Sequence, residues 1–279
     1  MPGDIWARWL DDAEREVSAD RQVRLLRSQV RDRVLHRASL RPGAVVLDLG
    51  CGTGFLSLEA ARVVGRGGMV IAADSSEGAL RTLSRRAEER GLENLRPLHA
   101  DVGRLPVEDR AVDAVVSRSV LCYVRDRAAV LREALRVLKP GGFLSIFEPV
   151  LAEEEISMDW GEERFLWEKA TGILKTAHPS YAFRRSDLVR EVKEAGFQEV
   201  ESFTWHAEVT RPYSGTDEAL RELRDCLPGE LSPVSVWLRE GMSEGEVRAL
   251  AARLAAESAK PSYRDVLPCI YIWGRSPVG

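Results

Sequence analysis

Three alternate glycines are the feature of this chain most suggestive of chemistry. Gly50, Gly52 and Gly54 follow the apolar run AVVLDL and precede a stretch of small residues compatible with a helix. A turn of this kind, from strand to helix, lets the backbone approach a ligand closely, with helix N–H groups pointing at it. A purely structural turn is the alternative interpretation.

The spacing of the glycines narrows the class of ligand. The dinucleotide fingerprint G-x-G-x-x-G needs its third glycine at the position of Phe55, and no Lys-Ser or Lys-Thr pair follows to complete a P-loop. Asp48 lies just before the first glycine, where a carboxylate would repel a pyrophosphate but suits a ligand with positive charge and no phosphate. S-adenosylmethionine (SAM) is such a ligand, and an NAD-dependent oxidoreductase is disfavoured.

Two more acids follow the next predicted strands. Asp74 ends the run VIAAD, where a carboxylate can accept both ribose hydroxyls of a nucleoside that lies over the strand ends. Asp101 ends LHAD and could accept from an adenine amino group, while the N–H that follows, that of Val102, donates to a ring nitrogen. A cap on the following helix or turn is the alternative role for each acid.

The cysteines and histidines carry weaker signals. Cys51 could be a reactive thiol at a helix N-terminus, although a small residue filling a tight loop is the favoured interpretation. The cysteines show neither a CxxC pair nor zinc-ligand spacing, so we predict no disulfide framework and no metal site. They are Cys51, Cys122, Cys226 and Cys269, and the equally dispersed histidines are His36, His99, His178 and His206.

Regular strands and helices must position these residues, and the hydrophobic pattern of the sequence predicts such elements. Continuous apolar strands that alternate with helical stretches indicate an α/β fold with a parallel sheet covered on both faces. Strands are expected at 44–49, 69–74, 95–100, 112–117, 142–148, 197–209 and 268–275, and helices at 55–64, 76–90, 126–138 and 185–195.

The remaining segments suggest covers around this core. Two amphipathic helices are expected over residues 4–38. Residues 1–40 are predicted to cover the cofactor pocket, 41–211 with 266–279 to form the core, 150–183 to act as a lid segment, and 212–265 to be a helical insertion. The connection between the last two strands is far longer than a typical hairpin loop.

The composition of the chain restricts the kinds of molecule that the protein is expected to bind. The 279-residue chain has a formal net charge of -4, which argues against electrostatic binding to nucleic acid or to an anionic membrane. No apolar run is long enough to cross a bilayer, and the first residues lack the pattern of a signal peptide. We therefore expect a cytoplasmic protein.

Four motifs in order resemble those of a known family. They are VLDLGCGTG (46–54), VIAADSS (70–76), LHADVGRLPVEDRAVDAVVSRSVLCYV (98–124) and LREALRVLKPGGFLSIFEP (131–149). The chain resembles class I SAM-dependent methyltransferases, in particular the type 11 or UbiE-like group that acts on small molecules. The likeness is close over residues 30–150 and looser at 186–201. It implies a Rossmann-like, seven-stranded, mostly parallel sheet with an antiparallel last strand.

The resemblance also implies roles for individual residues. The glycines would flank the methionine part of SAM, Asp74 would bind the ribose and Asp101 the adenine. Ser117 and Arg118 would lie near the sulfonium and the methionine moiety, with a surface ion pair as the alternative for Arg118. The predicted cofactor-binding set is Asp48, Gly50, Cys51, Gly52, Gly54, Asp74, Ser75, Asp101, Val102, Ser117 and Arg118.

Candidates for catalysis are less well defined. His178 and Tyr181 lie in the lid segment, where a surface loop histidine is the alternative, and Glu148 could take a proton or serve as a hydrogen-bonding residue of the rim. His206 and Tyr213 are weaker candidates for substrate contact. Methyl transfer is an in-line displacement that depends mainly on positioning, and a general base helps only when the nucleophile must lose a proton.

The sequence therefore predicts a SAM-dependent methyltransferase, either a monomer or a homodimer, that methylates O, N or C of a small organic acceptor. The alternative is a protein of the same SAM-binding fold with a non-methylating role, as a cyclase-type enzyme or a partner subunit. Arsenite methylation would need converging thiols, which dispersed cysteines neither establish nor exclude.

Overall fold

The computed structural model describes residues 4, 6, 7, 9, 10, 21–208 and 212–278. Its contacts divide the chain into two compact units. The first comprises Met1–Glu148, Arg185–Thr204 and Ile270–Gly279, and the second comprises Pro149–Arg184 and Trp205–Cys269. Of the two helices expected over 4–38, the earlier lies mostly outside the described residues, whereas the later is α2 (Arg21–Arg37).

A mostly parallel sheet forms the centre of the first unit. Its strands are β1 (Val45–Leu49), β2 (Met69–Asp74), β3 (Leu95–His99), β4 (Val112–Arg118), β5 (Leu138–Pro149), β7 (Gln198–Glu208) and β8 (Arg264–Arg275). The end of β7 and the beginning of β8 belong to the second unit. The order is β3-β2-β1-β4-β5-β8, and β7 also pairs with β8. Strand β1 lies between β2 and β4 and runs parallel to both, so Val46, Leu47 and Leu49 are buried.

The last strand runs opposite to its neighbour β5. The N–H of Gly141 donates to the carbonyl of Pro277, and the N–H of Ser276 donates to that of Gly142, so residue numbers rise along one strand and fall along the other. The expected α/β fold, with its antiparallel last strand, is confirmed. The short strand β6 (Glu155–Ser157), which the sequence did not indicate, pairs antiparallel with β8 in the second unit.

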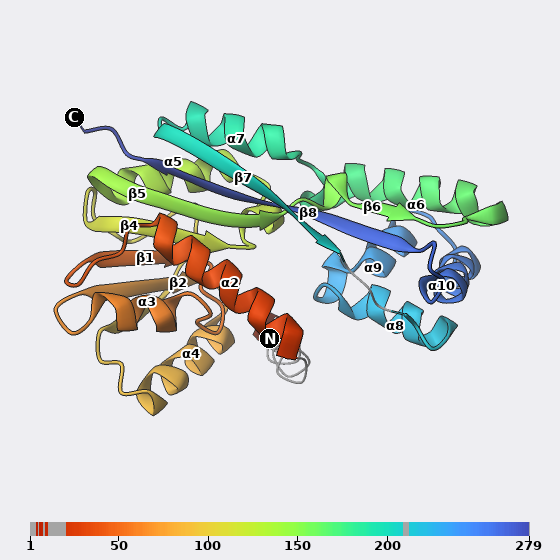
Figure 1. Ribbon diagram of the computed structural model, residues 1–279, viewed down its shortest axis with the longest axis horizontal. Helices are drawn as coiled ribbons and strands as arrows, with labels where there is room; N and C mark the ends of the chain where they lie inside the picture. Colours follow the sequence, from red (N-terminus) through yellow and green to blue (C-terminus); the bar gives the residue numbers. More distant parts are fainter. Residues whose placement is uncertain (1–3, 5, 8, 11–20, 209–211, 279) are drawn as a thin grey trace. The chain divides into compact units, whose positions relative to one another are not determined.

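Helices cover both faces of the sheet. In Figure 1, α2, α3 (Ser57–Val64) and α4 (Glu77–Glu89) lie on one face, and α5 (Arg127–Val137) and α7 (Arg185–Glu194) on the other. Helix α4 begins where the Ser76 hydroxyl accepts from the N–H of Ala79, and its Leu80 and Leu83 side chains are buried. This cap fixes where α4 starts relative to the end of β2.

The second unit is largely helical. It contains α6 (Arg164–Ala177), α8 (Thr216–Asp225), α9 (Pro233–Arg239), α10 (Glu244–Ser258) and β6. Short 3-10 helices are η1 (Leu121–Tyr123) in the first unit and η2 (Leu151–Glu153), η3 (Gly161–Glu163), η4 (Pro179–Tyr181) and η5 (Gly229–Leu231) in the second.

One hydrophobic core joins the lid segment to the insertion. Trp160, Ala170 and Leu174 pack in a single cluster with residues of α9 and α10 that include Trp237 and Leu250. The indole N–H of Trp237 donates to the carbonyl of Ala170 at 2.9 Å. Helix α6 was missed in the sequence, although the spacing of Ala170 and Leu174 is helical.

Candidate functional site

The glycine turn has a backbone that only glycine suits. Gly50, Gly52 and Gly54 have φ of 64°, 50° and 97°. A Cβ at Gly50 would lie 2.3 Å from a methyl carbon of Val120, and a Cβ at Gly54 would lie 2.3 Å from one of Leu83. Only glycine therefore fits between these side chains, and the backbone of the turn forms a closely packed cradle at the carboxyl end of β1.

Asp74 connects this turn to the end of β2. Its carboxylate accepts from the N–H of Gly52 and from the N–H of Ser76, each at 2.8 Å. Burial raises the pKa of Asp74, against the effect of these hydrogen bonds. Each carboxylate oxygen can accept a further bond. Asp74 thus fixes the turn and keeps acceptor capacity for a ligand, whereas Ser76 acts as the cap of α4.

Asp48 and Cys51 are buried beneath the turn. The Ser57 hydroxyl donates to Asp48 at 2.5 Å. Burial raises the pKa of Asp48 to about 7, an effect that Ser57 opposes and the charge of Asp74 reinforces. Burial, together with the charges of Asp48 and Asp74, also raises the pKa of the Cys51 thiol. Cys51 therefore remains a neutral thiol, which favours the small-residue interpretation over a reactive one.

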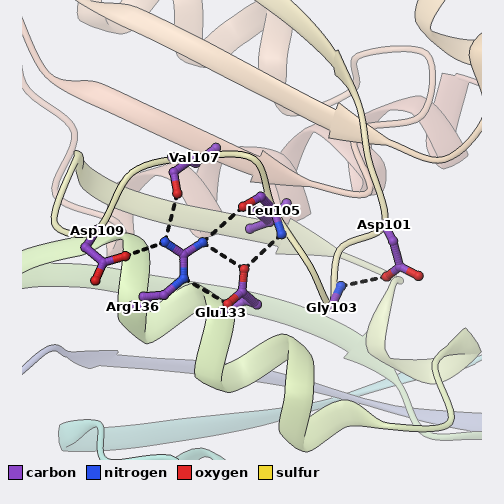
Figure 2. A network of polar contacts seen from close by, with 7 residues as sticks. All are labelled: Asp101, Gly103, Leu105, Val107, Asp109, Glu133 and Arg136. Carbon is purple, nitrogen blue, oxygen red and sulfur yellow. Dashed lines mark hydrogen bonds and ion pairs between the residues drawn. The ribbon is translucent and has the colours of Figure 1, made fainter.

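Asp101 begins an exposed loop that α5 holds in place. Its carboxylate accepts from the N–H of Gly103 at 2.7 Å, as Figure 2 shows. The guanidinium of Arg136 donates to Leu105 O at 3.1 Å, Val107 O at 2.8 Å, Asp109 at 2.5 Å and both oxygens of Glu133. Sequence reasoning missed Arg136 because nothing in its helix marks an arginine that contacts a loop so far back in the chain.

Ser75 and Val102 follow the ends of β2 and β3. Ser75 is exposed and Val102 is half-buried. The N–H of Ala100 donates to the carbonyl of Asp74, which ties the two strand ends together. The structure thus brings together the acids predicted for ribose and adenine.

Described residues near the N-terminus lie over this region. Asp4 accepts from the Ser76 hydroxyl at 2.5 Å and from the N–H of Gly78 at 2.8 Å. Although burial opposes it, these hydrogen bonds lower the pKa of Asp4. A Cβ at Gly52 would lie 3.2 Å from a methyl carbon of Leu10, so the N-terminal segment contacts the turn itself.

Ser117 and Arg118 end β4, beside the glycine turn. The Ser117 hydroxyl donates to the carbonyl of Leu49 at 3.2 Å. The guanidinium of Arg118 lies over the ring of Phe55 at 4.7 Å, and that of Arg27 lies 4.9 Å from the same ring. Burial, with a contribution from Arg27, lowers the pKa of Arg118 to about 10. Arg27 and Phe55 were not predicted as site residues, although Phe55 stands out at the position of the missing third glycine.

Glu148 is fully buried at the end of β5. Its carboxylate accepts from the N–H groups of Val120, Leu121 and Cys122, at 2.9, 3.0 and 3.1 Å. These bonds fix the loop that follows β4. They favour the role of a hydrogen-bonding residue over that of a proton acceptor, and the catalytic role of Glu148 stays a prediction.

His178 and Tyr181 belong to the second unit. His178 is buried, so the alternative of a surface histidine is wrong. Its Nε2 lies 2.8 Å from the carbonyl of Leu231 and its Nδ1 accepts from the N–H of Ser180, and burial lowers its pKa. The Tyr181 ring packs edge-on against His178, and burial raises the pKa of its hydroxyl. Both nitrogens of His178 are engaged in holding the chain, and its catalytic role stays a prediction.

The remaining candidate sites receive little support. Tyr213 packs against the hydrophobic core of the second unit. Within the part of the chain that the structure describes, no cluster of three or more His, Cys, Asp or Glu side chains could hold a metal ion. No helix of that part is long and apolar enough to cross a membrane.

Comparison with known proteins agrees with this geometry. A sheet whose first strand ends in a glycine cradle, with acids at the ends of the next two strands, defines an α/β domain that binds a nucleoside-bearing ligand. A family model described as "Methyltransferase domain" matches residues 40–199. The chain belongs to this family, and its cofactor is SAM.

Individual relatives match only part of their own length. An arsenite methyltransferase of Halobacterium salinarum is 31% identical over 59% of this chain and 40% of that protein. A demethylmenaquinone methyltransferase of Geobacillus kaustophilus is 30% identical over 61% of this chain and 78% of that protein. The crystal structure of the [4+2]-cyclase SpnF superimposes with a TM-score of 0.55 and 23% identity, covering 90% of this chain and 81% of that one, which shows a shared fold.

Proposed function

We propose that this protein transfers the methyl group of SAM to O, N or C of a small organic acceptor. The observation that carries the proposal is the glycine cradle locked by Asp74, since a ligand there must bring positive charge and no phosphate next to two buried acids. The family and the small-molecule relatives support the same reaction class.

The residues of the first unit fit the cofactor. The positive-φ glycines allow the backbone of the turn to approach a methionine moiety closely, the lone pairs of Asp74 can accept ribose hydroxyls, and Asp101 lies at the end of the neighbouring strand. SAM supplies a methyl group on a positively charged sulfur that leaves with its electron pair. The protein contributes alignment of the acceptor atom opposite that sulfur, an effect of order 7 kcal/mol in ideal cases.

A non-methylating role is the second candidate function, because SpnF, which shares this fold, is a [4+2]-cyclase. Production of S-adenosylhomocysteine separates the two functions. The net charge of -4 supports a small-molecule acceptor rather than nucleic acid, and we propose a cytoplasmic monomer or homodimer.

The test is a screen of small-molecule acceptors with S-adenosylhomocysteine release as the readout, followed by the mass shift of the product. We expect release with at least one acceptor class. Tight SAM binding without release from any acceptor would contradict methylation and favour the second candidate.

Asp74→Ala tests the cofactor site directly. The loss of charge-assisted hydrogen bonds to ribose should weaken SAM binding by about 1.5–3 kcal/mol, measured by calorimetry. Unchanged affinity would remove Asp74 from the site.

A further inference from the structure

An arginine beside the glycine turn has a buried nitrogen without a partner. The side chain of Arg118 makes no hydrogen bond or ion pair with any residue that the structure describes, and its Nε is buried without an acceptor. Its contact is the face of Phe55, a neutral ring. A buried N–H without an acceptor is costly, because the hydrogen bond that it loses to water is not replaced.

The charged groups near Arg118 do not provide a hydrogen-bond acceptor for its Nε. Arg27 lies over the same Phe55 ring, so a second cation adds to the positive potential. The carboxylate of Glu148 attracts Arg118 at a distance but is bonded to three backbone N–H groups. Among the described residues, no acceptor is therefore bonded to the buried Nε of Arg118 at the end of β4.

SAM brings one carboxylate into this region, together with an ammonium and a sulfonium. A guanidinium has five N–H donors, so Arg118 can bind that carboxylate and still bind a second anion. An anion contributed by the second substrate would be attracted by Arg118 and by the sulfonium together. Aromatic rings surround this arginine in part. Phe55 lies under Arg118, and Tyr123, which interacts electrostatically with Arg118, meets the ring of Trp6 edge to face at 5.1 Å.

We propose that Arg118 binds an anionic group of the acceptor, so that the preferred substrates are small organic acids, carboxylates or acidic phenols, with an apolar or aromatic body. Arg118 is a specificity-determining residue in this arrangement. Its charge also keeps an acidic hydroxyl of the acceptor ionised, which removes the need for a general base. The inference rests on the proposed function in one respect, which is that the anion bound by Arg118 belongs to the methyl acceptor.

The experiment measures binding to protein saturated with S-adenosylhomocysteine, so that the cofactor's own carboxylate is already in place. Three matched pairs serve as probes: acetate with acetamide, benzoate with benzamide, and naphthoate with naphthamide. We expect at least one carboxylate to bind about tenfold more tightly than its amide, as a charge-assisted hydrogen bond would give. Added salt should reduce this preference.

Variants assign the preference to Arg118. Arg118→Gln should bring each carboxylate to within about twofold of its amide, and Arg118→Lys should retain part of the preference. Arg275→Gln is the matched control, because Arg275 also lies over a phenylalanine ring, Phe143 at 4.6 Å, but pairs with Glu199. It should leave the preference unchanged.

Two results would overturn the inference. One is the absence of a carboxylate preference in all three pairs with the wild-type protein. The other is a carboxylate preference that persists in Arg118→Gln, and if this variant also binds SAM at least tenfold more weakly, the guanidinium serves the cofactor instead. Failure of the methyltransferase proposal looks different: no S-adenosylhomocysteine forms with any acceptor, although the binding preference stands.

Discussion

At the scale of single residues, two buried acids determine the charge beside the glycine turn. Asp48 is almost fully buried and interacts electrostatically with Asp74, so both cannot ionise cheaply in the absence of a cation. A cofactor with a sulfonium and an ammonium group supplies that cation. Proton uptake and cofactor binding should therefore be linked at Asp48.

Burial raises the pKa of Asp48 from 3.8 to about 7, so the folded protein holds a proton that the unfolded chain releases. The stability contributed by this proton is present below pH 4 and is lost as pH rises toward 7. SAM should restore the ionised carboxylate, so its binding near pH 6 should release a proton. Calorimetry in two buffers of different ionisation enthalpy measures this release.

Asp48→Asn is the control, because its side-chain oxygen can still accept from the Ser57 hydroxyl. The variant should show no buffer-dependent heat at this pH beyond the cofactor's own titration. Equal heats in both buffers for the wild-type protein would contradict the linkage.

At the scale of elements, loops are positioned by residues on neighbouring helices. The loop from Asp101 to Asp109 has one isolated bridge of its own, between Asp101 and Arg104, and Gly103 donates to Asp101. Arg136 of α5 donates to the carbonyls of Leu105 and Val107, as Figure 2 shows. The hydrogen bond from Arg136 lowers the pKa of Glu133, which in turn accepts from the N–H of Leu105. One side chain therefore fixes the loop that carries the predicted adenine contact.

Arg136→Gln should free this loop, because two backbone carbonyls and two carboxylates lose their donor. We expect a stability loss of about 1–2 kcal/mol and faster hydrogen exchange in residues 101–109. SAM affinity should fall several-fold by calorimetry. Arg132→Gln, an exposed position of the same helix, is the control, and unchanged exchange in the loop would refute the prediction.

At the scale of the whole molecule, two compact units have separate hydrophobic cores. All predicted cofactor residues lie in the first unit, whereas Trp237 and its cluster lie in the second. Destabilising the second core should therefore affect its own helices before the cofactor site.

Trp237→Ala removes a fully buried side chain and its hydrogen bond to Ala170, so it should cost about 3–5 kcal/mol in the second unit. Hydrogen exchange should rise in α6 and α10, while SAM affinity changes less than threefold. Phe165→Ala, at an exposed position of α6, should be nearly neutral. A parallel loss of SAM binding in Trp237→Ala would show that the units are not energetically separate.

Many of the strands and helices could be predicted from the local sequence pattern. Strand β2 was predicted with its observed bounds, and α3 begins two residues later than expected because the glycine turn continues past Gly54. Helix α6 was missed because its polar residues and Gly172 mask a narrow apolar stripe that becomes evident only against the insertion. The glycines, Asp74 and Asp101 were identified because parallel strands end at a common edge, so strand order alone brings them together.

The sequence by itself determined the alternation of strands and helices, the glycine cradle and the acids at the strand ends, because each depends on short-range spacing. Only the tertiary structure decided that Glu148 holds three amides, that His178 is buried with both nitrogens engaged, and that Arg27, Phe55 and Arg118 converge. These contacts join residues far apart in the chain, and their energies depend on burial, which no local pattern encodes.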